Sequence, residues 1–348
     1  MRLVICGNGF DLHHKLKTSY GCYKEYLQNK KKKNIETFEF LVGFHDEKID
    51  MWKDIEESLN INWRKFFEKE LSKPRTQNEV YELTHDESIL HFISGLEILI
   101  RALDDAMTDF TGKDLYEWFS SIDISKAIPD LPLNPNDKYI TFNYLETLEQ
   151  LYSVPTGNVF HIHGDIGRLD YLSDEMKRKR EELIKDQISN PDCYLDEELE
   201  DIYSDIDQEC RELMSTEIRS VLQFGAAVSD LKQVIDEIFD WYKGDEGYEE
   251  YLGRSALSID HLISICSKNP SQNFDVLRRW LANLTGVDEI VIMGHSLNSV
   301  DNEYYSKILV PAFRNKKWIF YRHSDEDNSN ITNFIKTMKI TDYDVIDW

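Results

Sequence analysis

The sequence has few cysteines, and their spacing matches no familiar cysteine framework. The five cysteines, Cys6, Cys22, Cys193, Cys210 and Cys266, are scattered along the chain and include no C-x-x-C pair. An odd set of widely spaced cysteines predicts neither a disulfide framework nor a cysteine-rich zinc site. The cysteines therefore favour a reducing compartment.

Long apolar runs and a secretion signal are also missing. No window of the sequence approaches the roughly 18 uninterrupted apolar residues that a membrane-spanning helix needs. The amino terminus runs into a short apolar stretch at Leu3–Cys6, without the basic segment, long apolar segment or cleavage site of a secretion signal. We expect a cytoplasmic protein with no membrane partner.

Basic residues are scarce relative to acidic ones. The 348 residues include 65 acidic and 40 basic side chains, which gives a net charge of -25. Such a chain repels nucleic-acid phosphates, so we expect no nucleic-acid partner. With 41% hydrophobic and 12% aromatic residues, the chain is able to bury a large core.

Short apolar runs predict the strands of an α/β fold. Most of them are followed by turn residues and then by a pattern suited to a helix, as in a Rossmann-like, mostly parallel sheet. A weaker run at Arg219–Gln223 predicts one further strand. The five stronger runs are Arg2–Cys6, Lys138–Phe142, Asn158–Ile162, Glu289–Met293 and Lys317–Tyr321.

Two long stretches between these strands predict large helical insertions into a single elaborated α/β domain, residues 1–348. The first, residues 21–137, contains helical periodicity at Met51–Leu71 and Ser88–Phe119. The second, residues 173–286, is acidic and mainly helical, and its charges are typical of a solvated helix face. Neither stretch is needed for a simple crossover between strands.

The first strand is followed by Gly7-Asn8-Gly9-Phe10-Asp11-Leu12. Glycines between a strand and a helix allow close backbone approach, and the helix amino terminus offers N–H groups to a pyrophosphate. Leu12 replaces the third glycine of the G-x-G-x-x-G fingerprint. The segment therefore indicates either a dinucleotide or phosphate site, or only a tight structural turn.

The second strand ends at Thr141-Phe142-Asn143-Tyr144. Ligands of open α/β sheets bind at the carboxyl ends of the strands, where Asn143 would bind a ligand hydroxyl or orient a water. The alternative is that Asn143 caps the following helix, because asparagine is a favourable N-cap residue.

The third strand ends at His161-Ile162-His163-Gly164-Asp165. Alternating residues of a strand point to the same face, which predicts that the two histidines lie together. A histidine there would act as a general base near neutral pH, or would be a core histidine held by a backbone carbonyl. We expect no metal, because no convincing set of further ligands accompanies the pair.

The fourth segment, Gly294-His295-Ser296-Leu297, resembles the start of a serine-hydrolase elbow, G-x-S-x-G. However, Asn298 replaces the final glycine, and His323, the one histidine after Ser296, precedes the nearby acids instead of following them. The segment therefore favours a turn in which Gly294 and Ser296 contact a ribose or phosphate.

Together these segments resemble the bacteriophage abortive-infection AbiH family over nearly the whole chain. The motifs are the GNGFDL opening, W-x-D-x-E-x-x-L at Trp52–Leu59, TFNY with a trailing TLE, HIHG, and GHSL-x-x-x-D. Their order is also similar to that of sirtuin-type NAD-binding domains. Leu145 replaces an expected aspartate and the zinc-binding cysteine quartet is missing, so protein deacylation is not expected.

The resemblance implies a sirtuin-like NAD-binding core in which Asn143 lies near the nicotinamide ribose and His163 is the general base. Asp11 would bind a ribose hydroxyl or stabilise the developing positive charge. These three residues are the expected catalytic set. The expected NAD-binding residues are Gly7, Asn8, Gly9, Phe10, Thr141, His161, Gly164, Gly294, His295, Ser296 and Asp301.

The resemblance therefore implies an NAD-consuming glycohydrolase of an antiphage system, which releases nicotinamide and ADP-ribose. Its expected partners are NAD or a related dinucleotide, a phage-derived protein trigger and a second copy of the chain. One alternative is a non-catalytic nucleotide-binding sensor. A metal-dependent phosphoesterase or nuclease is another, and it would use His161, His163, Asp165 and His295.

Overall fold

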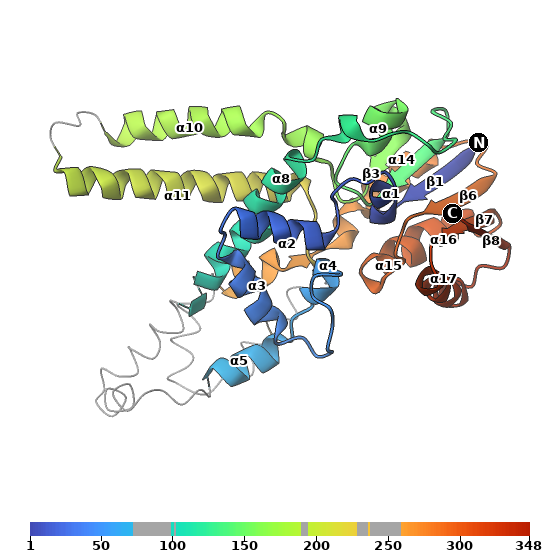
Figure 1. Cartoon of the computed structure of the whole chain (residues 1–348), viewed down its shortest axis with the longest axis horizontal. Helices are drawn as coiled ribbons and strands as arrows, with labels where there is room; N and C mark the ends of the chain where they lie inside the picture. Colours follow the sequence, from blue (N-terminus) through green and yellow to red (C-terminus); the bar gives the residue numbers. More distant parts are fainter. Residues whose placement is uncertain (72–98, 101, 189–193, 228–235, 237–258) are drawn as a thin grey trace. The chain divides into compact units, whose positions relative to one another are not determined.

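The computed structural model of the chain describes residues 1–71, 99–100, 102–188, 194–227, 236 and 259–348 (Figure 1). These residues form two compact units. The first consists of Met1–Ser19, Gly112–Gln223 and Asn273–Trp348, and the second of Tyr20–Thr111 and Phe224–Gln272.

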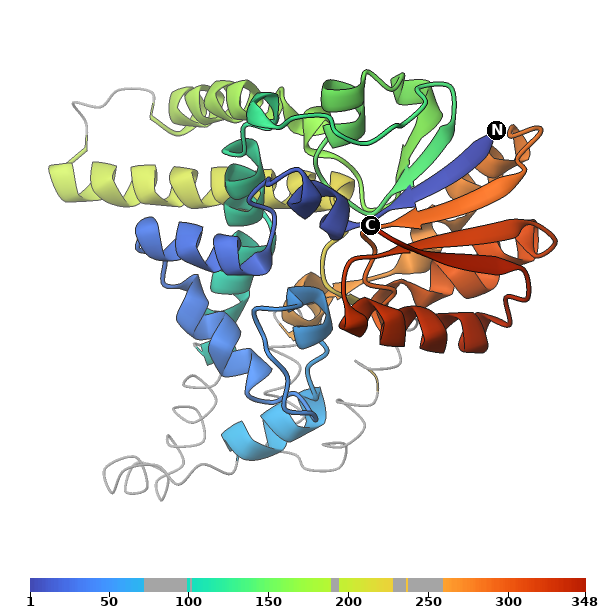
Figure 2. The same ribbon diagram turned by 45° about the vertical axis from the view of Figure 1, so that its right-hand side comes forward.

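The first unit is built on a six-stranded sheet in which every neighbouring pair is parallel (Figure 2). The spatial order is β3-β2-β1-β6-β7-β8. In chain order these six strands run 3-2-1-4-5-6, which is the order of dinucleotide-binding Rossmann sheets. The strands are β1 (Arg2–Cys6), β2 (Lys138–Thr141), β3 (Val159–His161), β6 (Glu289–Met293), β7 (Lys317–Arg322) and β8 (Tyr343–Asp347).

Alternating residues of the central strands contribute to two hydrophobic cores. Leu3 and Ile5 of β1 pack in one core, while Val4 and Cys6 pack in the other. The first core includes residues of α14 to α17, and the second includes residues of α1 and α9. Helices thus cover both faces of the sheet, so both faces of β1 are apolar.

The helices of the first unit differ widely in length. The longest, α11, packs along α10 as a helical hairpin (Figure 1). The α-helices are α1 (Asn8–His13), α8 (Lys113–Ser120), α9 (Thr147–Tyr152), α10 (Leu172–Gln187), α11 (Asp196–Val221), α14 (Phe274–Ala282), α15 (Asn302–Tyr304), α16 (Val310–Phe313) and α17 (Asp325–Met338). The short helical turns are η1 (Ile124–Lys126), η2 (Thr156–Asn158), η3 (Ile166–Leu169), η6 (Ser299–Asp301) and the π-helical η7 (Tyr305–Leu309).

The second unit is mainly helical. Residues 102–111 and 259–265 are helical, and a short parallel pair joins β4 (Ala226–Ala227) to β5 (Ser267–Lys268). The turn η5 (Pro270–Asn273) follows β5. The labelled helices are α2 (Tyr20–Asn29), α3 (Asn34–Val42), α4 (Ile55–Ser58) and α5 (Trp63–Leu71).

The W-x-D-x-E-x-x-L motif holds this second unit together. The indole Nε1 of Trp52 donates to Glu39 at 3.0 Å, and the carboxylate of Asp54 accepts from the Glu57 N–H at the start of α4. Glu56 forms a 2.5 Å ion pair with Lys268 of β5. The motif therefore has a packing explanation within its own unit.

Two turns close over each other where the strand order reverses, between β1 and β6. The Gly9 N–H donates to the Gly294 carbonyl at 2.7 Å. A Cβ atom on Gly294, which has φ +61°, would lie 2.2 Å from the Phe10 nitrogen, and one on Gly9 would lie 2.7 Å from the Gly294 Cα. Glycine is required here because the two backbones touch.

The predicted α/β fold with a mostly parallel sheet is confirmed. Strands β1 and β6 have the predicted bounds, and β2 ends one residue early. Strand β3 begins one residue later and ends one residue earlier than predicted, and β7 ends one residue later. The strand predicted at Arg219–Gln223 is wrong, because α11 continues to Val221 and the buried Ser215, Ile218 and Leu222 follow a helical period. Strand β8 was not predicted, because all five of its residues are exposed.

The predicted helical stretch Met51–Leu71 forms α4 and α5, with non-helical residues between them. Residues 88–98 of the predicted stretch Ser88–Phe119 lie outside the described residues, as does Cys193. The insertion boundaries of 21–137 and 173–286, and the single domain, stay predictions. The described cysteines are free thiols. None of the helices in the described ranges has the length and apolar character that a membrane crossing requires.

Gly294→Ala should destabilise the fold much more than Gly286→Ala. Both glycines have positive φ, but a Cβ on Gly286 meets nothing within 4 Å. We expect Gly286→Ala to lower the free energy of unfolding by about 1–2 kcal/mol, the cost of a left-handed backbone. Gly294→Ala should add about 1–3 kcal/mol of steric strain. Equal losses in urea unfolding would contradict the close contact of the two turns.

Candidate functional site

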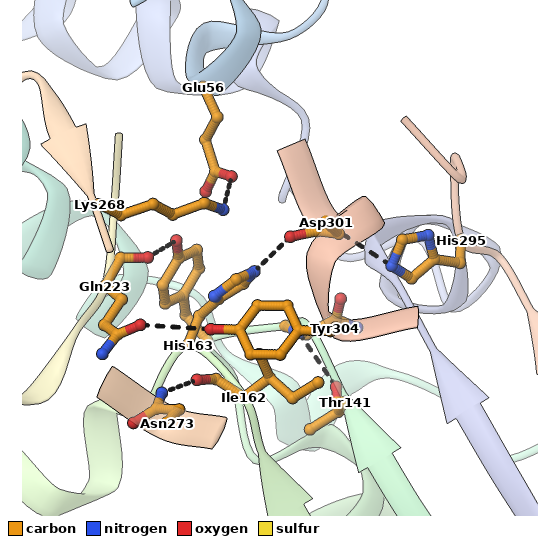
Figure 3. Close-up of polar contacts among 12 residues, drawn as sticks. Glu56, Thr141, Ile162, His163, Gln223, Lys268, Asn273, His295, Asp301 and Tyr304 are labelled. Atoms are coloured by element: carbon orange, nitrogen blue, oxygen red, sulfur yellow. Dashed lines mark hydrogen bonds and ion pairs between the residues drawn. The ribbon is translucent and has the colours of Figure 1, made fainter. Parts of the chain in front are cut away.

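Polar side chains gather at the carboxyl ends of β1, β2, β3 and β6. They form two groups, defined here by their contacts. The Asp11 group consists of Asp11, Asn143, Thr147, Glu149 and His161. The His163 group consists of His163, His295 and Asp301, and Figure 3 shows it beside the end of the sheet.

A buried carboxylate links the two histidines of the His163 group. Nε2 of His163 lies 3.1 Å from Oδ1 of Asp301, and Nε2 of His295 lies 3.6 Å from Oδ2 of the same carboxylate. All three side chains are at most 9% exposed. Asp301 is thus placed to orient both rings and to stabilise positive charge on either.

The turn after β6 sets the tautomer of His295. Its Nδ1 lies 2.9 Å from the Leu297 nitrogen and accepts that N–H, so neutral His295 carries its proton on Nε2, which faces Asp301. Leu297 adopts φ 56°, which is strained for a residue with a Cβ. The positive φ values fall on Gly294 and Leu297 and not on Ser296. Ser296 therefore lacks the strained backbone of a nucleophile elbow.

The end of helix α11 holds the backbone of His163. The Gln223 N–H donates to the His163 carbonyl at 2.9 Å, and the Tyr144 hydroxyl donates to the Gln223 carbonyl at 2.9 Å. At Gly164, φ is +80° and a Cβ would lie 1.9 Å from the Val221 carbonyl oxygen. Helix α10 begins nine residues after His163, so both ends of the hairpin are attached near this histidine.

The Asp11 group surrounds the loop after β2. The Asn143 N–H donates to Oγ1 of Thr141 at 3.0 Å, and its carbonyl lies 3.3 Å from Nδ1 of His161. Asn143 is 5% exposed, and its Oδ1 has no hydrogen-bond partner. Glu146, and not Asn143, is the N-cap of α9, so the capping alternative does not hold.

Burial dominates the chemistry of Asp11. Loss of solvation raises the pKa of this carboxyl to about 7, although Thr147, Asn143 and the charge of His161 each act to lower it. Asp11 is 1% exposed, and its Oδ1 has no hydrogen-bond partner. A carboxyl group with a pKa near neutrality is suited to exchanging protons or to donating a hydrogen bond.

His161 forms a buried ion pair with Glu149. Its Nε2 lies 3.0 Å from Oε1 of Glu149, and the side chains are 5% and 11% exposed. Burial lowers the pKa of His161, but Glu149, Asp165 and the Asn143 carbonyl outweigh it, so the net pKa is raised. Strand β3 ends at His161, and the two histidines of the H-x-H pair take different partners.

The glycine turn has partners within the protein. The N–H groups of Gly9 and Phe10 donate to Gly294 and Gly7, and the Asn8 amide donates to the Thr18 carbonyl. The Phe10 ring is buried in the core. Ser296, in contrast, is exposed. NAD binding by these residues stays a prediction.

Three residues of the site were not predicted from the sequence: Thr147, Glu149 and Gln223. Thr147 and Glu149 belong to the TLE segment that trails TFNY, so the motif contained a signal for both. Gln223 lies in the stretch that was interpreted as a strand. Its contact with His163 depends on where α11 ends, which no local pattern reveals.

The fold and the site define a Rossmann-like α/β protein with buried acid–base groups at the carboxyl edge of its sheet. The family model for bacteriophage abortive infection AbiH matches residues 3–322. The chain belongs to the AbiH family. No curated protein and no solved structure matches it.

Asp11→Asn should change how stability depends on pH. Because folding raises the pKa of Asp11, the native state binds the extra proton, and wild-type stability falls as pH rises from about 4 to about 7. The variant lacks this loss. Its stability relative to wild type should increase across that range by up to roughly 4 kcal/mol, at 1.36 kcal/mol per pKa unit.

Urea unfolding at several pH values measures this difference. Asp170→Asn, which replaces an exposed carboxylate, is the matched control and should show little trend. A constant difference between Asp11→Asn and wild type would show that Asp11 titrates normally.

Proposed function

We propose that the chain is an NAD glycohydrolase that acts in abortive infection. The observation that carries this proposal is the pairing of His163 with the buried Asp301 at the carboxyl edge of the sheet, at 3.1 Å. A histidine held by a carboxylate is an effective general base near neutral pH. Membership of the AbiH family supports the role in phage defence.

The sheet supports a dinucleotide as the ligand. Its strand order is that of dinucleotide-binding sheets, whose ligands lie at the carboxyl ends of the strands near the point where the order reverses. Both polar groups occur at those strand ends. The similarity of the motif order to sirtuin-type domains supports NAD as the particular dinucleotide.

The proposed reaction is the attack of water on C1′ of the nicotinamide ribose. The bond from C1′ to the nicotinamide nitrogen breaks, and nicotinamide leaves with the electron pair as a neutral molecule. His163 accepts the proton of the water through Nδ1, because its Nε2 faces Asp301. Asp301 stabilises the imidazolium that forms. Asn143 orients the water or a ribose hydroxyl through its unpartnered Oδ1.

The closed turns restrict how such a dinucleotide binds. The Gly9 and Phe10 N–H groups already donate to the Gly294 and Gly7 carbonyls, so a pyrophosphate would have to displace those two carbonyls to reach them. The proposal therefore places the nicotinamide ribose at His163 and Asn143. In this arrangement the two glycine turns stay hydrogen-bonded to each other and lie beneath the ligand.

We further propose that a phage-derived protein triggers the activity. The attachment of the α10–α11 hairpin to the backbone of His163 gives such a trigger a route to the general base. A binding protein without turnover is the second candidate. The buried, apolar Leu145, at the position where an acid is expected, favours it.

His163→Ala and Asp301→Asn should each lower the rate of NAD cleavage by about 100-fold or more, because each removes general-base catalysis. The assay separates nicotinamide and ADP-ribose from NAD by chromatography with mass detection. His323→Ala, which removes an exposed histidine, should keep the wild-type rate.

Wild-type activity in either site variant would refute the assigned base. Loss of wild-type activity with a chelator would point to a metal-dependent phosphoesterase instead. Saturable NAD binding without product, in the presence of lysate from phage-infected cells, would favour the non-catalytic sensor.

A further inference from the structure

Both ring nitrogens of His161 face oxygen acceptors. Nε2 lies 3.0 Å from the Glu149 carboxylate, and Nδ1 lies 3.3 Å from the Asn143 carbonyl. A carbonyl oxygen is only an acceptor, so Nδ1 must carry a proton to make its hydrogen bond. A proton on Nε2 as well gives the imidazolium, which satisfies both contacts at once.

The surroundings of His161 favour that charged form. The side chain is 5% exposed, and a charge at such a site needs a partner, which Glu149 provides. The other titratable groups whose charges act here are Asp165 after β3 and Asp11 on α1. Glu149, Asp165 and Asp11 are all carboxyl groups, and they belong to three different segments of the chain.

The ion pair fixes the loop that carries Asn143. His161 holds the Asn143 carbonyl, and Thr141 accepts the Asn143 N–H at 3.0 Å, so both backbone polar groups of Asn143 are fixed. Its side-chain Oδ1 is left without a hydrogen-bond partner. The backbone is thus locked, while the side-chain Oδ1 remains available for a ligand.

We propose that His161 and Glu149 are positioning residues, which act as a buried imidazolium–carboxylate pair to hold Asn143 for the reaction. This role replaces the direct NAD contact that the motif resemblance implies for His161. The catalytic part of this inference, that the pair holds Asn143 for the reaction, rests on the proposed function. The charge state of His161 does not depend on that function.

The first test is NMR of the folded full chain with ¹⁵N-labelled histidine, using His161→Gln to assign the His161 signals. At pH 7 we expect both His161 nitrogens to be protonated in wild type. In Glu149→Gln the pKa of His161 falls, so the ring loses its second proton at lower pH. A neutral His161 ring at pH 7 in wild type would overturn the proposal, whether or not NAD is cleaved.

The second test measures NAD cleavage in Glu149→Gln against pH. Hydrogen-bond partners that orient metal-ligating side chains typically contribute about 10- to 100-fold to activity, and by the same logic kcat should fall about 10-fold or more while KM changes little. The loss of activity at high pH should also move to lower pH than in wild type. Glu146→Gln, the same substitution three residues earlier, should leave the rate and the pH profile unchanged.

The two tests fail separately. If wild type does not cleave NAD but His161 is an imidazolium, the proposed function fails and the pairing stands. If wild type cleaves NAD and Glu149→Gln keeps its kcat and pH profile, the positioning role is wrong. If Glu149→Gln does not fold, the NMR result on wild type still decides the charge state.

Discussion

The hydrogen bond from the Gly9 N–H to the Gly294 carbonyl is the constraint on which the site depends. At 2.7 Å it joins the turns after β1 and β6, the neighbouring strands where the chain order of the sheet reverses. Asp11 follows Gly9 by two residues, and His295 directly follows Gly294. One backbone contact therefore sets the positions from which both polar groups are built. It also explains why glycine occupies these turns without invoking a phosphate.

Burial is the second physical constraint on the site. Titratable side chains are removed from water there, and the pKa of each then depends on a few neighbouring groups. Asp11 receives little compensation, and its pKa rises to about 7. His161 has Glu149 beside it, and its pKa is raised despite its burial. Such different environments give titratable groups different roles: some groups exchange protons, and others hold a charge. Asp301 lies beside the Nε2 atoms of both His163 and His295 and is buried with them.

The sequence pattern predicted those features of the fold that depend on residues close together in the chain. Strands β1 and β6 are apolar on both faces, and their bounds were predicted correctly. Strand β8 has no buried residue and so left no hydrophobic signal. The strand ends that carry Asn143, His163 and Asp301 were also found, because polar residues follow apolar runs. The contact between His163 and Asp301 joins residues that are 138 positions apart in the sequence. The hydrogen bond from Gln223 to the His163 carbonyl depends on the residue at which α11 ends. Both arise from tertiary packing, which a single sequence does not specify.

The most direct test of the account is a crystal structure of the protein with a carbocyclic NAD analogue that resists glycosidic cleavage. We predict that the nicotinamide ribose lies at the carboxyl ends of β1, β2 and β3, in contact with the Asn143 side chain and with Nδ1 of His163. The Gly9 to Gly294 hydrogen bond should remain closed beneath it. An analogue bound away from these residues, or no bound analogue at saturating concentration, would contradict the account.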